Sequence, residues 1–428
     1  MRRTYHVVSR QGKVGERQLA EFFRNSGQQL LPMVELIEQC RLAVDEVIEV
    51  LGRKTIETIL EVSAEQIAGP RAQGRASEEV RWHGHQRGRV RLADRKLRVQ
   101  KPRLRQRGRG AGGEVKIPAY EALQQGSTGE KMLETLLRGV STREYEQVIP
   151  EMAETVGVSR SSVSREASQA AEAEMEKLLS RDWSAVELLA IYLDGMQLGS
   201  HHVLSAVGVD PEGRKHVLGM VEGASENQAA AQALLVHLRE HGVDTGKRYL
   251  FVIDGAKALR AAIREVFGSQ QPVQRCRTHK LRNVVEQLPR DQHAQVKAVM
   301  RAAYRLDAAS GMAKLRKLAE WLQRDWEAAA NSLLEGLEET FTINTLDIPP
   351  TLHRCLATTN IIESPQSGLR RRTRNVTRWR DAAMAKRWAA AALVLTERKF
   401  RKIMGHRDLW ALAAILGRST PASREKVA

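Results

Sequence analysis

The sequence predicts an α/β protein whose strand-containing layer is interrupted by an all-α insertion and preceded by helical regions. Between Leu188 and Cys276, apolar segments follow the order β-β-β-α-β-α-β. From about Leu281 to Leu337 the pattern is helical throughout, which is the predicted insertion. A chain of 428 residues, 42% of them hydrophobic, can bury real cores and suggests about two to four modules.

The first part of the chain predicts helices followed by a basic hairpin. From about Gly15 to Glu65, apolar residues recur at spacings that a helix could bury on one side. Between Arg81 and Arg109, apolar residues alternate with basic ones, as in a β-hairpin, and the glycine- and arginine-rich stretch 107–113 predicts a mobile tether. Because this charge has one sign, we predict an arm that follows a DNA backbone, with a solvated hairpin as the alternative.

Residues 130–179 predict three helices joined by tight turns. Ser141 and Glu144 have the spacing of a capping box, and Ser159 can cap the next helix. That helix begins with small, polar and basic residues, while Val163 and Ala167 face inward. This pattern is typical of the recognition helix of a helix-turn-helix, whose first turns enter the major groove. The predicted DNA contacts are Arg160, Ser161, Ser162, Ser164 and Arg165.

The following layer contains five predicted strands and two predicted helices. The strands are expected at 188–198, 202–209, 215–222, 249–254 and 273–276, and the helices at 227–241 and 258–267. In this order the first and fourth strands lie side by side, and the unbroken apolar run of the fourth predicts burial on both faces. Beyond the insertion, 359–400 is expected to be helical. Within the insertion, Trp321 and Trp326 are expected in the core, with base stacking as the alternative.

Two acids mark the strands that are expected to be neighbours. Asp194 and Asp254 each end a strand and each precede a glycine. Two carboxylates held close together repel each other unless cations lie between them, and a pair of Mg²⁺ or Mn²⁺ ions about 4 Å apart fits such a site. Oxygen ligands alone favour magnesium over zinc. Glu363 is the expected third ligand, on a helix that Asn360 or Ser364 begins, and Pro365 is tolerable only in the first turn of that helix.

Five stretches then carry a resemblance to a known family. They are YLDG around Asp194, VIDGAKALRAAIREVFG from Val252, VQRCRTHKLRNV from Val273, TTNIIES around Glu363 and TRNVTRWRDAAMAKRW from Thr373. In order and spacing they resemble the signature blocks of mutator-type transposases, which are carried by bacterial insertion sequences and related to eukaryotic Mutator-like elements. The resemblance covers roughly 130–417 and extends to the N-terminal part as well. Pro365 departs from it, since a larger apolar residue is expected there.

The resemblance implies a fold, an activity and a substrate. The implied fold is ribonuclease-H-like (retroviral-integrase-like), with a helical insertion before the last acid. The separations, 254 − 194 = 60 and 363 − 254 = 109 residues, leave room for that insertion in the second interval. The implied catalytic residues are an Asp-Asp-Glu triad of Asp194, Asp254 and Glu363. The implied activity is recognition of terminal inverted repeats, metal-dependent cleavage, and strand transfer into target DNA.

Further residues surround these acids in the sequence. Cys276 and His279 match a Cys-x-x-His element of that family. Zinc would need further ligands, for which His353 and Cys355 are conceivable, but we do not expect zinc. Instead Cys276, His279 and Asn360 are expected to be structural residues near the site. The densest downstream charge predicts a phosphate clamp, with a solvated face as the alternative, and consists of Arg370, Arg371, Arg372, Arg374 and Arg378.

Composition supports a nucleic-acid partner. The chain has 68 basic and 51 acidic residues, a net charge of +17, which favours a polyanion. The absence of any run of about 18 apolar residues argues against a membrane span. Three scattered cysteines predict reduced thiols and therefore a cytoplasmic protein. The resemblance implies a bacterial protein associated with the nucleoid. Holding two DNA ends would need at least a homodimer. The alternatives are a DNA-binding regulator with an inactive nuclease-like body, and a nuclease or resolvase that cuts without joining.

These expectations divide the chain into six parts. The predicted divisions are a helical region 1–75, a basic hairpin and linker 76–125, a helix-turn-helix 126–182, a first part of the catalytic core 183–285, a helical insertion 286–345, and a last part of the core with C-terminal helices 346–428.

Overall fold

The computed structural model describes residues 53–71, 79–92, 95–108, 113–125, 129–142, 145, 155–156, 158–223 and 228–418. The chain divides into two compact units. Unit 1 comprises Met1–Leu136 and Val140–Ala170, and unit 2 comprises Leu137–Gly139 and Ala171–Ala428. None of the helices in these ranges is both long enough and apolar enough to cross a bilayer.

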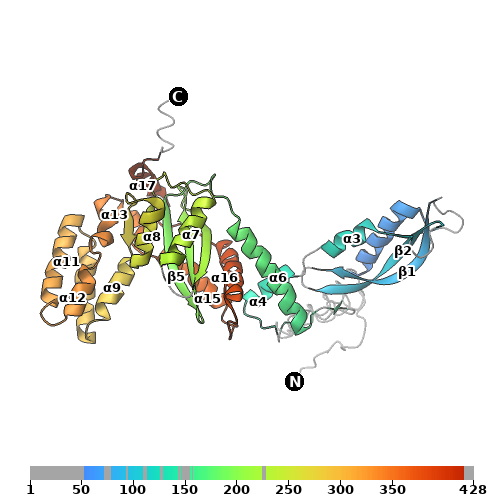
Figure 1. Cartoon of the computed structure of the whole chain (residues 1–428), viewed down its shortest axis with the longest axis horizontal. Coiled ribbons are helices and arrows are strands. Elements are labelled where there is room, and N and C mark those ends of the chain that lie inside the picture. The colour runs from blue at the N-terminus through green and yellow to red at the C-terminus, as the bar shows by residue number, and fades with distance from the viewer. Residues whose placement is uncertain are drawn as a thin grey trace, which may run out of the picture. The chain divides into compact units, whose positions relative to one another are not determined.

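A twisted hairpin is the main feature of unit 1, as the alternating pattern predicted (Figure 1). Strand β1 (Val80–Arg91) pairs antiparallel with β2 (Lys96–Gln106), and two short strands, β3 (Glu114–Val115) and β4 (Thr155–Val156), pair with β2. The helix at 53–68 and α3 (Pro118–Gln125) pack on the inward side chains of the hairpin. The outward side chains of β1 alternate with these and are largely basic.

The N-terminal predictions are only partly covered by the described residues. Of the helical prediction for Gly15–Glu65, residues 53–65 are described and are helical, and the rest lies outside. In the predicted tether, 109–112 also lie outside. On either side of these residues, the backbone N–H of Gln106 donates to the carbonyl of Gly113, and β2 pairs with β3.

The predicted helix-turn-helix is described only at its two ends. Helices α4 (Gly129–Leu137) and α6 (Arg160–Leu179) are present, whereas Glu144 of the predicted capping box and most of the middle helix lie outside the described residues. Residues 155–156, within the span predicted to be helical, form β4 instead. Val163 and Ala167 are buried, which confirms the predicted inward face.

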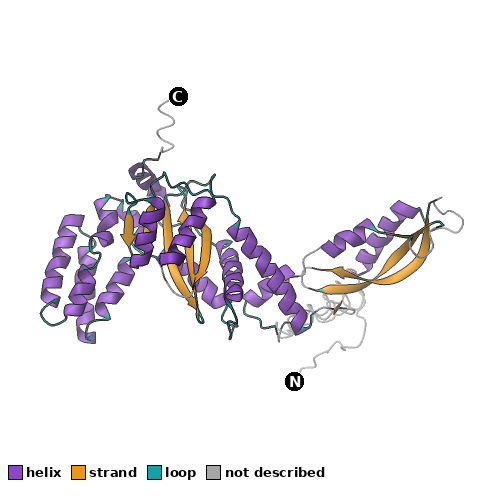
Figure 2. Cartoon of the chain, in the orientation of Figure 1, coloured by secondary structure: helices purple, strands orange, loops and turns teal. Residues whose placement is uncertain are grey.

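A mixed five-stranded sheet forms the centre of unit 2 (Figure 2). Its strands are β5 (Ala190–Leu198), β6 (His201–Val209), β7 (Lys215–Gly223), β8 (Leu250–Ile253) and β9 (Val273–Arg275). In the order β7-β6-β5-β8-β9, the first three are antiparallel, and β5, β8 and β9 are parallel. The five predicted strands and the pairing of the first with the fourth are confirmed.

Helices cover both faces of this sheet. Helices α7 (Gln228–Glu240) and α8 (Lys257–Phe267) bury an apolar face on one side. On the other side the core contains residues of α14 (Pro350–Leu356), α15 (Asn360–Arg372) and α17 (Leu409–Ile415). The alanine-rich α16 (Ala382–Glu397) follows α15. Residues 373–381 between them are not helical, which corrects the prediction of a helical 359–400.

The insertion between β9 and α14 has a core of its own. It contains α9 (Arg277–Val285), η2 (Arg290–Gln292), α10 (His293–Ala303), α11 (Ala308–Leu322), α12 (Glu327–Leu334), η3 (Glu338–Phe341) and α13 (Thr342–Thr345). The rings of Trp321 and Trp326 lie 5.4 Å apart, partly buried against this core, in agreement with the core prediction. A short turn, η4 (His406–Asp408), precedes α17.

Candidate active site

The two aspartates lie side by side because of the strand register. Leu193 of β5 pairs with Ile253 of β8 in a parallel ladder, and the next residue in each chain segment is Asp194 or Asp254. Asp254 follows β8, whereas Asp194 lies inside β5, which continues to Leu198 beside β6. This corrects the prediction that Asp194 ends its strand. It lies where the pairing with β8 ends, and it is buried, with 6% of its surface exposed.

The turn after Asp254 depends on a glycine. Gly255 has a φ of +109°, a conformation that side-chain-bearing residues rarely adopt. A Cβ atom there would lie 2.0 Å from Nε of Arg275, so Gly255 is also in close contact with that side chain. Arg275 is in turn held by Glu335, whose backbone carbonyl accepts a hydrogen bond from Nη1 at 2.8 Å. The carboxylate of Asp254 accepts from the N–H of Ala256 at 2.9 Å.

The third acid, Glu363, comes from α15. Ile361 and Ile362 of its first turn are buried in the core against the sheet. Glu363, the next residue, has 34% of its side chain exposed. The helix begins at Asn360, which is exposed. Pro365 lies beyond the first turn, which corrects the expected limit. It has no N–H to donate to the carbonyl of Ile361, so one helical hydrogen bond is missing directly after Glu363.

Thr359, which precedes α15, connects Glu363 to two further side chains. Its hydroxyl donates to Oε1 of Glu363 at 2.7 Å and lies 3.3 Å from both Nδ1 of His279 and Sγ of Cys276. A hydroxyl has one proton, and the shortest of these contacts, to the carboxylate, takes it. The imidazole N–H of His279 can then donate to the same oxygen. Thr359 is fully buried, whereas the side chains of His279 and Glu363 remain partly exposed.

Cys276 and His279 begin the helix that opens the insertion. Cys276 is the N-cap of α9, and its sulfur accepts from the backbone N–H of His279 at 3.5 Å and of Thr359 at 3.4 Å. Burial raises the pKa of Cys276, but the hydrogen bonds from His279 and Thr359 outweigh it and leave this pKa below its usual value. The hydrogen bond to Cys276 raises the pKa of His279 to about 9, against the effect of burial.

The charges of Asp194 and Glu363 also help to raise the pKa of His279. Both carboxylates therefore lie within electrostatic reach of one imidazole, which is protonated at neutral pH. Nδ1 of His279 lies 3.9 Å from Oε1 of Glu363. Asp194 and Glu363 thus lie near the same imidazole, and Asp254 follows the strand that pairs with that of Asp194.

The donor atoms of Cys276, His279 and Glu363 all lie within 4.8 Å of one another. A metal ion bound by these three atoms would have to displace the proton of His279. The further zinc ligands considered from the sequence are engaged elsewhere. Nε2 of His353 lies 2.8 Å from the carbonyl of Ile348, and Cys355 is packed in the sheet core. Carboxylate oxygens, by contrast, suit a hard cation such as Mg²⁺.

The predicted DNA contacts lie in both units. In unit 1, Ser162 is buried, and its hydroxyl donates to the carbonyl of Ser159, so it is not at the surface of α6 in this structure. The other four predicted residues of α6, Arg160, Ser161, Ser164 and Arg165, are exposed. In unit 2, Arg370, Arg371, Arg374 and Arg378 are exposed, and Arg372 is half-buried.

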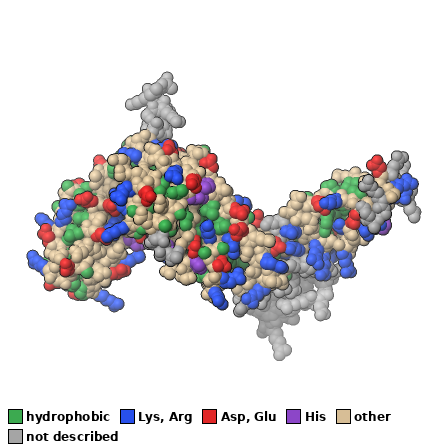
Figure 3. All heavy atoms as spheres, viewed as in Figure 1, with side chains coloured by type: hydrophobic (Ala, Val, Ile, Leu, Met, Phe, Trp, Pro, Cys, Tyr) green, Lys and Arg blue, Asp and Glu red, His purple; other side chains and the backbone are tan. Residues whose placement is uncertain are grey.

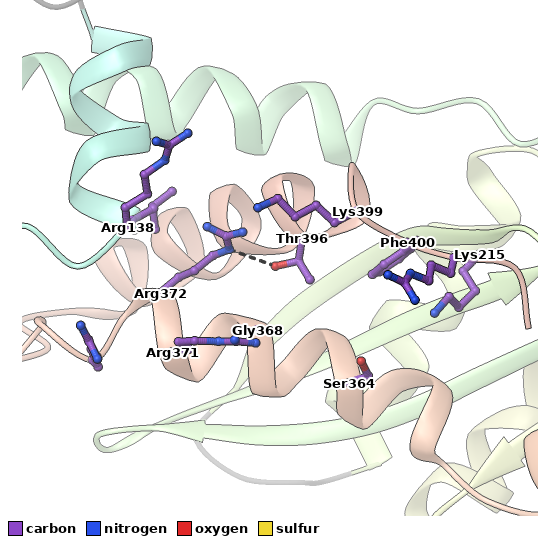
Figure 4. A pocket seen from close by; sticks show the side chains of 12 residues that line it. Arg138, Lys215, Ser364, Gly368, Arg371, Arg372, Thr396, Lys399 and Phe400 are labelled. Carbon is purple, nitrogen blue, oxygen red and sulfur yellow. Dashed lines mark hydrogen bonds between the residues drawn. The ribbon is translucent and has the colours of Figure 1, made fainter. Parts of the chain in front are cut away.

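Sequence reasoning missed two features of unit 2. Thr359 was detectable in principle, because it precedes the helix that carries Glu363. The other feature is a cavity of about 550 Å³ whose lining includes Arg371, Arg372 and Arg374 (Figure 4). Its further cations come from segments far apart in the sequence, so no local pattern could reveal them. They are Arg138, Lys215, Lys399 and Arg401.

Comparison with known proteins identifies related sequences. The family described as "Transposase, Mutator family" matches residues 27–402. The transposase for insertion sequence element ISRM5 of Rhizobium meliloti (strain 1021) is 28% identical over 334 residues, which cover 75% of this chain and 80% of that protein. The transposase for insertion sequence element IS905 of Lactococcus lactis is 26% identical over 263 residues, or 60% and 66% of the two chains. The transposase for IS256 in transposon Tn4001 of Staphylococcus aureus is 26% identical over 275 residues, or 61% and 68%.

Proposed function

Since the chain belongs to the Mutator family of transposases, we propose that Asp194, Asp254 and Glu363 form one active site that cuts and joins DNA. The observation that carries the proposal is the register of the parallel strands. In support, Leu193 pairs with Ile253, and the next residues are Asp194 and Asp254. The charges of Asp194 and of Glu363 on α15 both raise the pKa of His279, which supports a common site for the three carboxylates.

The residues fit a divalent cation of the magnesium type. They offer carboxylate oxygens only, and a buried carboxylate such as Asp194 gains from a nearby positive charge. Mg²⁺, or Mn²⁺ in its place, would activate the attacking water or 3′-hydroxyl and stabilise the leaving oxygen. Thr359 orients Glu363, the turn at Gly255 orients Asp254, and β5 fixes Asp194.

The proposed core is ribonuclease-H-like. In support, three antiparallel strands are followed by two that extend the sheet in parallel from β5, and the helical insertion lies between the second and third acids. The predicted divisions 183–285 and 346–428 would be the two parts of this core, around 286–345. The helix-turn-helix proposed for 126–182 would use the exposed residues at the start of α6.

The proposed substrate is double-stranded DNA with the terminal inverted repeats of an insertion sequence. Water would first free a 3′-hydroxyl at the element end, and that hydroxyl would then attack target DNA. At least a homodimer would hold two ends, in a bacterial cell at the nucleoid. The rival functions are an inactive regulator and a nuclease that does not join. The presence of all three acids in the sequence favours a catalytic protein over the regulator.

Metal binding tests the proposed site without relying on activity. We expect Mn²⁺ to bind the wild-type protein, as measured by calorimetry or by its electron paramagnetic resonance signal. Asp254→Asn and Glu363→Gln should each weaken binding by about 10-fold or more, because each removes a charged ligand. Asp325→Asn, at an exposed acid of the insertion, is the matched control and should bind as the wild type does. Equal Mn²⁺ affinity in all four proteins would refute the site.

A further inference from the structure

The cavity of about 550 Å³ in unit 2 is lined by cations and by no acidic residue. The C-terminal part of α15, the end of α16 with the residues after it, and the start of β7 provide most of its wall (Figure 4). Five of these cations have no ion-pair partner within the described part of the chain: Lys215, Arg371, Arg374, Lys399 and Arg401.

Such a concentration of like charge is costly in the free protein, because the cations repel one another across a hollow. Lys215 shows this most clearly. Burial lowers its pKa, its Nζ lies 4.7 Å from the centre of the Phe400 ring, and no carboxylate offsets the burial. A half-buried cation without an anion is stabilised when an anionic ligand enters.

The helices that form the wall of the cavity are also tightly packed. A Cβ atom at Gly368 would lie 2.8 Å from Cγ2 of Thr396, so this glycine lets α15 and α16 approach closely. Nε of Arg372 donates to Oγ1 of Thr396 at 3.3 Å, which ties the two helices together beside the cavity. The cations are therefore presented from a defined surface.

We propose that this cavity binds a backbone phosphate of the DNA strand on which the acids act. The proposal rests on the proposed function, since it assigns a binding place to that substrate. Arg side chains suit phosphate oxygens through paired N–H donors, and Lys provides a compact charge.

The cavity and the acids share one helix. Ser364, next to Glu363, lines the cavity, and Arg371 lies eight residues after Glu363 on α15. Eight residues span about 12 Å of helix. At about 3.4 Å per nucleotide along the axis, this corresponds to three or four nucleotides. The cavity would thus hold the strand a few nucleotides from the bond that is cut.

The test measures DNA binding in the absence of chemistry. The full chain with Asp254→Asn is titrated with a short labelled duplex over a range of salt concentrations, with and without Lys399→Gln and Arg401→Gln. Both of these residues are exposed, so the fold should survive. We expect weaker binding, and a salt dependence of log K that becomes shallower by about 1 for each phosphate that the variant no longer neutralises.

A matched control removes the same charge elsewhere. Lys314→Gln with Lys317→Gln, at exposed positions of α11, should change binding much less. An equal reduction in affinity in both double variants would mean that only net charge matters and would overturn the proposal. Inorganic phosphate is titrated as a second ligand. If the cavity variant no longer bound phosphate but kept full DNA affinity, the assignment to DNA would be wrong.

The experiments can refute the cavity proposal and the proposed function independently of each other. Binding is measured with the acid already replaced, so a cavity effect can persist even if the wild-type protein never cleaves DNA. Conversely, the wild-type protein could cleave DNA while the cavity variant binds DNA with unchanged affinity and salt dependence. That pair of results would contradict the cavity proposal and leave the proposed function standing.

Discussion

At the scale of single residues, Thr359 connects the parts of the proposed site. Its hydroxyl touches Glu363, His279 and Cys276, and its backbone carbonyl accepts the first hydrogen bonds of α15. It contacts a proposed metal ligand and is not one itself. Thr359 is therefore a positioning residue for Glu363.

Replacing this hydroxyl should affect metal use more than folding. We expect Thr359→Val, which has nearly the same shape, to raise the Mg²⁺ concentration needed for half-maximal cleavage by about 10-fold to 100-fold, as is usual when a metal ligand is deprived of its hydrogen-bond partner. Thr359→Ser keeps the hydroxyl and should restore most of the wild-type value. If both variants had the wild-type Mg²⁺ requirement, or if serine failed like valine, the positioning role would be incorrect.

The sequence predicted the three acids but not their surroundings. Asp194 and Asp254 stand out because each precedes a glycine on one of two strands expected to be neighbours, and Glu363 because it lies in a stretch that resembles a family signature. Thr359 is an ordinary residue before a helix, and its contact with Cys276 spans 83 positions of sequence. Contacts of that kind depend on tertiary packing and leave no local pattern.

At the scale of elements, α15 links the proposed chemistry to the cationic cavity. Its first turn carries Glu363, its buried side packs on the sheet, and its last turn carries Arg371 and Arg372. The fit between α15 and α16 depends on Gly368, whose missing side chain leaves room for Thr396.

Filling that space should destabilise unit 2. Gly368→Ala places a methyl group against Thr396, and we expect the free energy of unfolding to fall by about 1–3 kcal/mol, as is typical of overpacking. The measurement is chemical denaturation of both proteins. Thr396→Ala removes the two contacted atoms, so the double variant should recover much of this stability. Two fully additive single effects would show that the helices do not meet as described.

Helices and strands were predicted well where apolar residues recur in the sequence at a short, regular spacing. The five strands of unit 2 follow apolar runs bounded by turns, and their order followed from one parallel neighbour pair, β5 and β8. The break at 373–381 was missed, because Arg and Asn residues there do not interrupt a helix by themselves. Pro365 was wrongly confined to a first turn, although burial of Ile361 and Ile362 compensates for one missing hydrogen bond.

At the scale of the whole molecule, positive charge is concentrated on particular surfaces. The net charge of +17 predicted a polyanionic partner but gave no position for it. In unit 1, basic residues occupy the outward face of β1, among them Arg87, Arg89 and Arg91, and Figure 3 shows Lys and Arg side chains gathered along the hairpin. In unit 2 they line the cavity. Only the three-dimensional structure separates these two surfaces.

The central claim is that one carboxylate site both cleaves and joins DNA. The most direct measurement incubates purified protein with Mg²⁺ and labelled DNA that carries the terminal repeats of the element, beside Asp254→Asn. That variant keeps the shape of the side chain and removes its charge. We predict that the wild-type protein nicks and joins the DNA, whereas Asp254→Asn binds it without reaction. Equal binding with no reaction by either protein, or equal reaction by both, would contradict the account.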